Sequence, residues 1–335
     1  MSSPTSLKFG WKAGTEQYPP GELLEYAVTA EQAGFDSIDV SDHFHPWSEN
    51  GQACFVWTWL GAAAAKTKKI ILGTGVTCPI LRYHPTIIAQ AAATLGCLAP
   101  GRSFLGIGTG EALNEYSATG LWPPYNTRQA QVSEAIELIR ALWTGEAVTH
   151  RGKYYQTRKA KLYTRSDQSV PLYISAMVPN SARFAGLYGD GLVTVGGETP
   201  ETYHQILENF SVGAKAAGKD PNRLPRLIEL GVEFTDDKEK AIETRKAFWA
   251  GTFVPALFTE KIYTPTMSET NGKAVGSDII SESLCISADP EVHIKFARHY
   301  IDLGFNHLIF HAAGLDQRAF LEGYGQHVLP RLRQN

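Results

Sequence analysis

Titratable and aromatic side chains gather in one short stretch near the start of the chain. The segment "DSIDVSDHFHPW" runs from Asp36 to Trp47. Its first half alternates as a strand does, whereas Asp42, His43 and Trp47 follow at once. Histidine is suited to accept a proton near neutral pH. The segment therefore predicts an acid–base site directly after a strand.

A second candidate is the carboxylate of Glu111 in the glycine-rich segment "GIGTGEALNE". Strand, glycines and helix in that order leave backbone N–H groups free to approach a polar or anionic cofactor. The dinucleotide fingerprint would need a third glycine where Glu111 stands, and a phosphate loop would need a Lys-Ser/Thr pair that does not follow. Tight strand–helix packing would explain Gly106, but not a carboxylate on the same loop.

Two other interpretations of the histidines have to be weighed. An isolated histidine is most often a hydrogen-bonded core residue, but the adjacent Asp42 and the nearby Trp47 favour a functional role for His43. His43 and His45 could instead bind a metal ion together. Because no Asp or Glu stands at a third-ligand spacing, we predict a site without metal.

Short apolar runs alternate with longer amphipathic stretches along the whole chain. The strand-like runs lie at 7–11, 37–40, 69–76, 103–108, 170–176, 191–195, 226–234 and 306–312. This order is typical of an α/β protein built as a closed (β/α)8 TIM barrel, and no linker or internal repeat divides it. We therefore predict one domain over residues 1–335, with inserted loops near 101–126 and 250–285 at the catalytic face.

In such barrels the active site is built at the C-terminal ends of the strands. Glu16 follows the first predicted strand, Thr194 lies in the sixth and His311 in the eighth. If the barrel closes, these side chains should converge with His43 and Glu111 on one point. An acid, a base and a binding pocket at one place are what an enzyme requires.

Composition narrows the possible partners. The 335 residues carry 31 basic and 34 acidic side chains, a formal net charge of -3, which leaves no electrostatic footprint for nucleic acid. The polar start "MSSPTSLKFGWKAG" does not resemble a secretory signal, and no apolar run is long enough to span a membrane. Four scattered cysteines favour a reduced, cytoplasmic protein without a disulfide framework.

Several segments are together similar to one known family. The segments "VSDHFHPW", "CPILRYHPTIIAQAAATLGCLAPGR", "GIGTGEALNE", "FWAGTFVPALF" and "GFNHLIFHAAGLDQ" resemble the luciferase-like barrel family over nearly the whole chain. More narrowly, they resemble its dehydrogenases that use the 5-deazaflavin coenzyme F420: the glucose-6-phosphate, secondary alcohol and hydroxymycolic acid dehydrogenases. The resemblance implies a homodimer that binds a small-molecule alcohol or sugar, with the ring of coenzyme F420 in the barrel mouth.

The resemblance also implies roles for individual residues. His43 would remove the proton of the substrate hydroxyl, Trp47 would wall the site over the reacting carbon, and Glu111 would act as an acid towards the reduced ring or stabilise its charge. Asp42 would contact the coenzyme, and Glu16 would line the substrate side. A deazaflavin accepts a hydride at carbon, so the protein need only align a carbinol C–H and take the O–H proton.

Other positions match segments that hold the coenzyme. The segment under the ring, which has a non-proline cis peptide in the family, corresponds to Gly75, Val76 and Cys78. The ring and its phosphate-bearing tail would be held by Thr109, Gly110, Asn114, Ser175, Ala176 and Met177.

The sequence departs from the sugar-phosphate enzymes where basic residues hold the substrate phosphate. Gly197, Glu260 and Ser283 stand at the matching places, and Lys261 could compensate only after a one-residue shift. Each lost charge-assisted hydrogen bond costs about 1.5–3 kcal/mol. We therefore predict an unphosphorylated, preferably secondary alcohol as substrate, with glucose 6-phosphate as the alternative. The predicted substrate-side residues are Glu16, Thr194, Gly197, Lys261 and Ser283.

Two further classes compete with an F420-dependent dehydrogenase. A flavin monooxygenase could use the same barrel, because relatives in the family bind FMN. A barrel that only binds ligands is the third possibility, and the crowding of His43, Trp47 and Glu111 argues against it.

Overall fold

The computed structural model describes residues 6–254, 256 and 260–334. The ends of the predicted domain (1–5 and 335) and part of the second predicted insertion (255 and 257–259) lie outside the described residues. The strands are β1 Lys8–Ala13, β2 Ser37–Val40, β3 Ile71–Thr74, β4 Ser103–Ile107, β5 Leu172–Ser175, β6 Gly191–Val195, β7 Arg226–Glu233, β8 Cys285–Ile286 and β9 His307–His311.

All strand pairs are parallel, and the sheet closes on itself. The order is β6-β5-β4-β3-β2-β1-β9-β7, and β6 also pairs with β7, so eight strands form a barrel. The predicted (β/α)8 barrel and its eight strands are thereby confirmed. The two-residue strand β8, which extends the sheet beside the end of β7, was not predicted.

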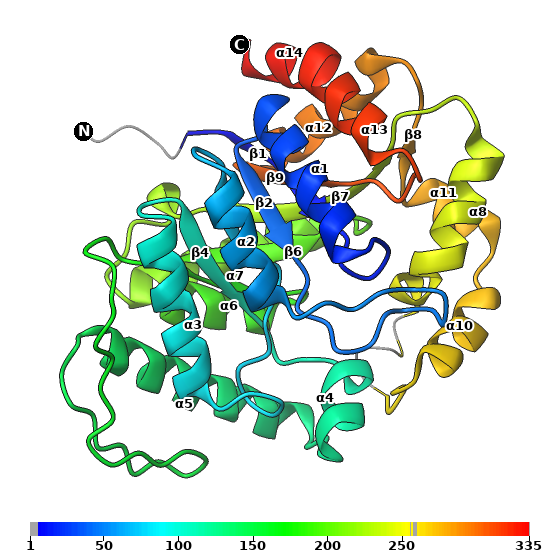
Figure 1. The fold of residues 1–335 in the computed structure, drawn as a ribbon. Coiled ribbons are helices and arrows are strands. Elements are labelled where there is room, and N and C mark those ends of the chain that lie inside the picture. The colour runs from blue at the N-terminus through cyan, green and yellow to red at the C-terminus, as the bar shows by residue number, and fades with distance from the viewer. Residues whose placement is uncertain (1–5, 255, 257–259, 335) are drawn as a thin grey trace.

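Helices connect the strands and surround the barrel (Figure 1). Several begin with a proline, which suits the first helical turn because its N–H groups have no partner within the helix. The α-helices are α1 Pro20–Gln32, α2 Val56–Lys66, α3 Pro85–Leu98, α4 Ala112–Thr119, α5 Tyr125–Trp143, α6 Pro179–Tyr188, α7 Pro200–Ala216, α8 Lys238–Trp249, α10 Pro265–Lys273, α11 Ser277–Glu282, α12 Pro290–Leu303, α13 Gln317–Gly323 and α14 Leu329–Arg333. η1 Pro221–Arg223 and η2 Ala250–Phe253 are 3-10 helices, and η3 Tyr324–Val328 is a short π-helix.

The strands bury both of their faces, because alternate side chains enter two different cores. One large core packs the strands against the helices and includes Leu105, Ile228 and Leu308. The neighbouring residues in sequence enter a separate cluster, which fills the barrel interior and contains Phe104, Tyr173, Val193, Leu227 and Ile309. The barrel floor is therefore dry and apolar.

Both predicted insertions carry helices. The first contains α4, and the described part of the second contains η2, α10 and α11. In Figure 1, α4 and α10 lie at the end of the barrel opposite α14. A hairpin between α5 and β5, with bridges Val148↔Ala160 and Arg151↔Gln156, was not predicted. Across the described residues, we find no helix with the length and apolarity needed to cross a membrane.

Candidate active site

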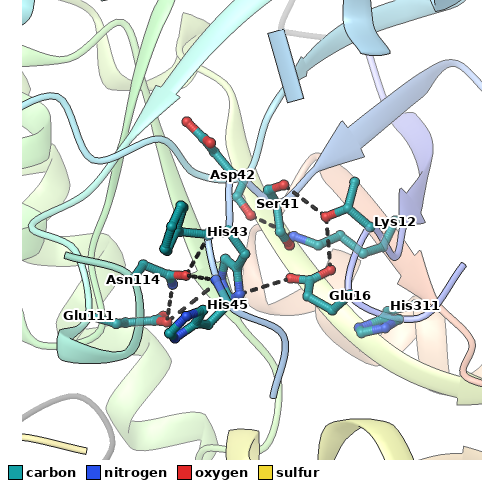
Figure 2. A network of polar contacts seen from close by, with 12 residues as sticks. Lys12, Glu16, Ser41, Asp42, His43, His45, Glu111, Asn114 and His311 are labelled. Atoms are coloured by element: carbon teal, nitrogen blue, oxygen red, sulfur yellow. Dashed lines mark hydrogen bonds and ion pairs between the residues drawn. The ribbon is translucent and has the colours of Figure 1, made fainter. Parts of the chain in front are cut away.

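The imidazole of His43 lies between two carboxyl groups that come from different strands (Figure 2). Its Nδ1 is 3.3 Å from Oε1 of Glu16, in the loop after β1, and its Nε2 is 3.6 Å from Oε2 of Glu111, in the loop after β4. The Glu16 side chain is fully buried, whereas that of Glu111 is 19% exposed. The structure thus brings together three residues that are far apart in sequence.

Burial controls the protonation of this group. It lowers the pKa of His43 against the opposing effect of Glu111, so the ring is held in its neutral form. Burial also raises the pKa values of Glu16 and Glu111. Neither Nδ1 of His43 nor Oε1 of Glu16 has a hydrogen-bond partner, although both atoms are buried. A group of this kind can accept a proton from a ligand and share it between three sites.

Trp47 forms an apolar wall beside His43. The two rings meet edge to face at a centroid distance of 5.0 Å, and Trp47 is 5% exposed. Trp47 packs in a cluster with Leu113, Trp249 and Ile262, which links the loop after β2 to both insertions. Water is thereby kept from one side of the imidazole.

Asp42 is next to His43 in sequence, but its side chain turns away from it (Figure 2). The carboxylate accepts hydrogen bonds from Thr77, Arg82 and Tyr83, and the side chain has no exposed surface. These hydrogen bonds tie the loop after β2 to the loop after β3. The coenzyme contact that the resemblance implies for Asp42 stays a prediction.

Asn114 has a similar internal role. Its Oδ1 accepts hydrogen bonds from the backbone N–H groups of Phe44 and His45, at 2.8 and 3.1 Å. Its Nδ2 donates to Oε2 of Glu111 at 3.3 Å. Asn114 therefore holds Glu111 against the histidine loop, and its predicted contact with the coenzyme stays a prediction.

The loops after β3 and β4 lie directly against each other. The N–H of Thr77 donates to the carbonyl of Gly106, and the N–H of Gly108 donates back to the carbonyl of Thr77. The approach requires glycine: a Cβ on Gly110, where φ is +78°, would lie 2.6 Å from Sγ of Cys78. The peptide bond between Gly75 and Val76 is cis, as the resemblance implied. The hydrogen bonds between the two loops place Gly75, Val76, Cys78, Thr109 and Gly110 on adjoining loops.

The segment after β5 continues the same surface. Gly108 lies close to Ser175, since a Cβ on the glycine would be 3.6 Å from the serine Cβ. Ala176 is buried, whereas Met177 is 38% exposed and its sulfur accepts a weak hydrogen bond from Thr194 at the end of β6. The predicted coenzyme segments after β3, β4 and β5 therefore form one continuous band, whose glycines and backbone groups suit a flat polar ring.

The predicted substrate-side residues are less tightly grouped. Lys261 is exposed, and its ammonium lies 4.8 Å from the ring centroid of Tyr116 on α4. Gly197 has φ of +103°, and a Cβ on it would have no neighbour within 4 Å, while the hydroxyl of Ser283 donates to the carbonyl of Ile279. Lys261 is the one cation among the predicted substrate-side residues.

A charged layer lies in the barrel between the acid–base group and the apolar floor, and sequence reasoning missed most of it. It consists of Lys12, Asp39 and Glu229, with ammonium–carboxylate distances of 3.1 and 2.9 Å. Nδ1 of His311 is 2.8 Å from Glu229. The signal in the sequence was a charged residue with an apolar neighbour on each side, in each of three strands. Within the described ranges, no three His, Cys, Asp or Glu residues are grouped to hold a metal ion.

The fold and this site define a (β/α)8-barrel enzyme with an acid–base centre at the strand ends. Residues 5–307 match the family described as luciferase-like monooxygenase. The chain is 42% identical to the F420-dependent glucose-6-phosphate dehydrogenase of Nakamurella multipartita, over 99% of this chain and 98% of that protein. It is also 42% identical to the enzyme of the same name from Mycolicibacterium smegmatis, over 98% of each chain.

A solved structure titled F420-dependent secondary alcohol dehydrogenase in complex with an F420-acetone adduct is 39% identical. It superposes with a TM-score of 0.94 over 98% of this chain and 100% of that chain. The chain belongs to the luciferase-like family and, within it, to the F420-dependent dehydrogenases.

Proposed function

We propose that the protein oxidises an unphosphorylated alcohol, preferably a secondary one, with coenzyme F420 as hydride acceptor. The observation that carries the proposal is the buried, neutral His43 held between Glu16 and Glu111 at the barrel mouth. Relatives at 42% and 39% identity carry the name of the coenzyme in their own names.

The chain's own residues would prepare the alcohol for reaction. Nδ1 of His43 faces Glu16 at 3.3 Å, so we assign the ring proton to this nitrogen, which leaves Nε2, on the side of the more exposed Glu111, to take the hydroxyl proton. Two nearby carboxyl groups stabilise the imidazolium that forms. Trp47 excludes water beside the carbinol carbon, and its flat ring limits how the alcohol can lie.

The band formed by the loops after β3, β4 and β5 would hold the coenzyme. The candidate residues are Gly75, Val76, Cys78, Thr109, Gly110, Asn114, Ser175, Ala176 and Met177, with Asp42 in the adjoining loop after β2. Coenzyme F420 supplies, when bound, a ring carbon that accepts the hydride leaving the carbinol carbon. Glu111 lies beside this band and would stabilise charge or deliver a proton to the reduced ring, because burial raises its pKa.

Titration with purified F420 and with FMN tests the choice of cofactor. We expect saturable binding of F420, followed by loss of its fluorescence when a secondary alcohol is added. Uptake of FMN with consumption of oxygen, and no response to F420, would replace the proposal with a flavin monooxygenase.

Glucose 6-phosphate remains the second candidate substrate, because the curated relatives at 42% identity are named for it. Against it, Gly197 and Ser283 offer no cation, and Lys261 is held over the ring of Tyr116. A screen of alcohols and sugar phosphates with F420 decides between them. Saturation by glucose 6-phosphate at low concentration, without any alcohol activity, would reverse the preference.

We also propose that two copies of the chain associate through α2 and α3. Phe55 at the start of α2, together with Ile87 and Leu98 on α3, are large apolar side chains with 53%, 51% and 54% of their surface exposed. Exposed apolar side chains on neighbouring helices are suited to a protein interface. Light scattering on the wild type and on Ile87→Lys tests this, with a dimer expected for the wild type and a shift to monomer for the variant.

A reducing, cytoplasmic location fits the cysteines. Cys54, Cys78, Cys97 and Cys285 are all free thiols, and Cys78 and Cys285 are buried. Free thiols persist where glutathione and thioredoxin keep cysteine reduced. Fractionation of cells that express the protein would test this location.

A further inference from the structure

Lys12 is the fifth of the six residues of β1, and only 3% of it is exposed. Its ammonium lies 3.1 Å from Oδ1 of Asp39 and 2.9 Å from Oε2 of Glu229. A third contact, at 2.6 Å, goes to the backbone carbonyl of Gly75 in the loop after β3. An ammonium group has three N–H donors, so Lys12 spends one on each of these acceptors.

The three contacts keep Lys12 charged. Burial would lower its pKa, but the neighbouring Asp39 and Glu229 outweigh that effect and raise it. Glu229 is in turn held as a carboxylate by Lys12 and His311, which lower its pKa against the effect of burial. A buried ammonium fully enclosed by acceptors cannot move without leaving a charge unpaired, so its position is rigid.

The third acceptor is the unusual one, because it belongs to a loop and not to a strand. The loop is pressed onto the charged layer: a Cβ on Gly75 would lie only 1.7 Å from Oδ1 of Asp39. Beyond Gly75, the side chain of Val76 rests on the apolar floor of the barrel. The position of this loop along the barrel axis is therefore fixed by its contacts with Lys12 and with the apolar floor.

We propose that Lys12 is a positioning residue, which sets the loop of Gly75 and Val76 at the height where it receives the coenzyme ring. The proposal rests on the proposed function for the identity of the coenzyme. Lys12 acts through the carbonyl of Gly75, and the atoms of Lys12 themselves stay beneath the loop. Without the ammonium, the carbonyl of Gly75 loses its donor and the carboxylates of Asp39 and Glu229 lose their partner, so the loop is released.

Lys12 also acts on the acid–base group above it. Its positive charge lowers the pKa of His43, and it lowers those of Glu16 and Glu111 as well. Removal of the charge should therefore raise the pKa of His43. The catalytic reaction requires the neutral imidazole, so the acid limb of the pH profile should move to higher pH. A role confined to folding would not cause this shift.

The test is the dissociation constant of F420, measured by fluorescence titration of Lys12→Met. We expect the constant to rise by about 10-fold or more, in line with the loss of a charge-assisted hydrogen bond. The KM for F420 should rise more than kcat falls. Lys8→Met is the matched control, because Lys8 lies four residues earlier on the same face of β1, at the other end of the barrel. The control should keep the affinity of the wild type.

Lys12→Met leaves two carboxylates unpaired, so a second variant, Lys12→Met with Glu229→Gln, removes the cation together with one of them. Circular dichroism and thermal melting establish that a variant is folded, and the same rise in the dissociation constant is expected for both. A folded variant with the F420 affinity and pH profile of the wild type would overturn the role of Lys12. Failure of the wild type to bind F420 would instead overturn the proposed function.

Discussion

Two layers of the same barrel each surround a basic side chain with carboxyl groups, but the pKa of the basic side chain is lowered in one layer and raised in the other. At the mouth, the carboxyl groups of Glu16 and Glu111 face a histidine, whose pKa burial lowers. In the charged layer below, Asp39 and Glu229 face the ammonium of Lys12. The partner makes the difference: an imidazole can lose its charge near neutral pH, whereas a paired ammonium cannot.

The comparison separates the function of the two layers. Buried polar atoms without partners occur at the mouth, on His43 and Glu16, while all three donors of Lys12 are used. Unpaired atoms leave room for a ligand to complete the group, and complete pairing gives a rigid support. Changes at the mouth should therefore affect turnover, and changes below should affect stability and coenzyme binding.

The largest effect is expected from His43→Ala. Loss of the base should lower kcat by about 10²–10⁴-fold, while F420 binding is largely kept because the coenzyme band is untouched. Steady-state kinetics with a secondary alcohol, beside a fluorescence titration, measures both. His45→Ala on the same loop is the control and should lose far less. Near-normal turnover of His43→Ala would remove this residue from the mechanism.

Glu111→Gln should have the next largest effect. The substitution removes a charge-assisted contact worth about 1.5–3 kcal/mol, so kcat should fall by about 10-fold to 100-fold. Glu111 opposes the lowering of the His43 pKa, so its loss should move the acid limb of the pH profile to lower pH. A pH profile of kcat/KM checks the direction. An acid limb that stays in place would mean that Glu111 does not act on His43.

Substrate choice should respond to a cation at position 283. Ser283→Arg should improve kcat/KM for glucose 6-phosphate by roughly 10-fold, because a guanidinium can pair with a dianion. Position 197 is less suitable, since its φ of +103° favours glycine. Ser283→Gln controls for side-chain size. Equal gains in both variants would show that charge is not the reason for the substrate preference.

The smallest effect on turnover is expected from Glu229→Gln, which should lower stability instead. The folded pKa of Glu229 is below its unfolded value of about 4.3, so its stabilising effect is present above that pH and lost as the pH falls. The variant should be less stable by about 1–3 kcal/mol at neutral pH. Its stability should also depend less on pH below about 4 than that of the wild type. Chemical unfolding at several pH values tests this, with the exposed Glu208→Gln as control.

The barrel fold could be predicted from the sequence, because eight strand patterns alternate with helical ones and parallel strands need such crossovers. It also indicated that Glu16, His43 and Glu111 would meet, since each follows the end of a strand. These inferences depend on periodicity and position, which a single sequence displays directly.

The sequence could not reveal which polar groups pair with one another. The hydrogen bonds that Asp42 accepts from Arg82 and that Asn114 donates to Glu111 were not predicted. Lys12 was overlooked because its partners lie on β2 and β7, far along the chain. Such pairings depend on the register between strands, which local patterns do not specify.

The most direct test of the account follows a labelled hydride. Isopropanol with deuterium at its carbinol carbon is incubated with the protein and F420, and the reduced coenzyme is analysed by mass spectrometry. We predict that the coenzyme gains one deuterium atom and that acetone appears in equal amount. A reduced coenzyme without the label, or no reduction in the presence of any alcohol, would contradict hydride transfer at this site.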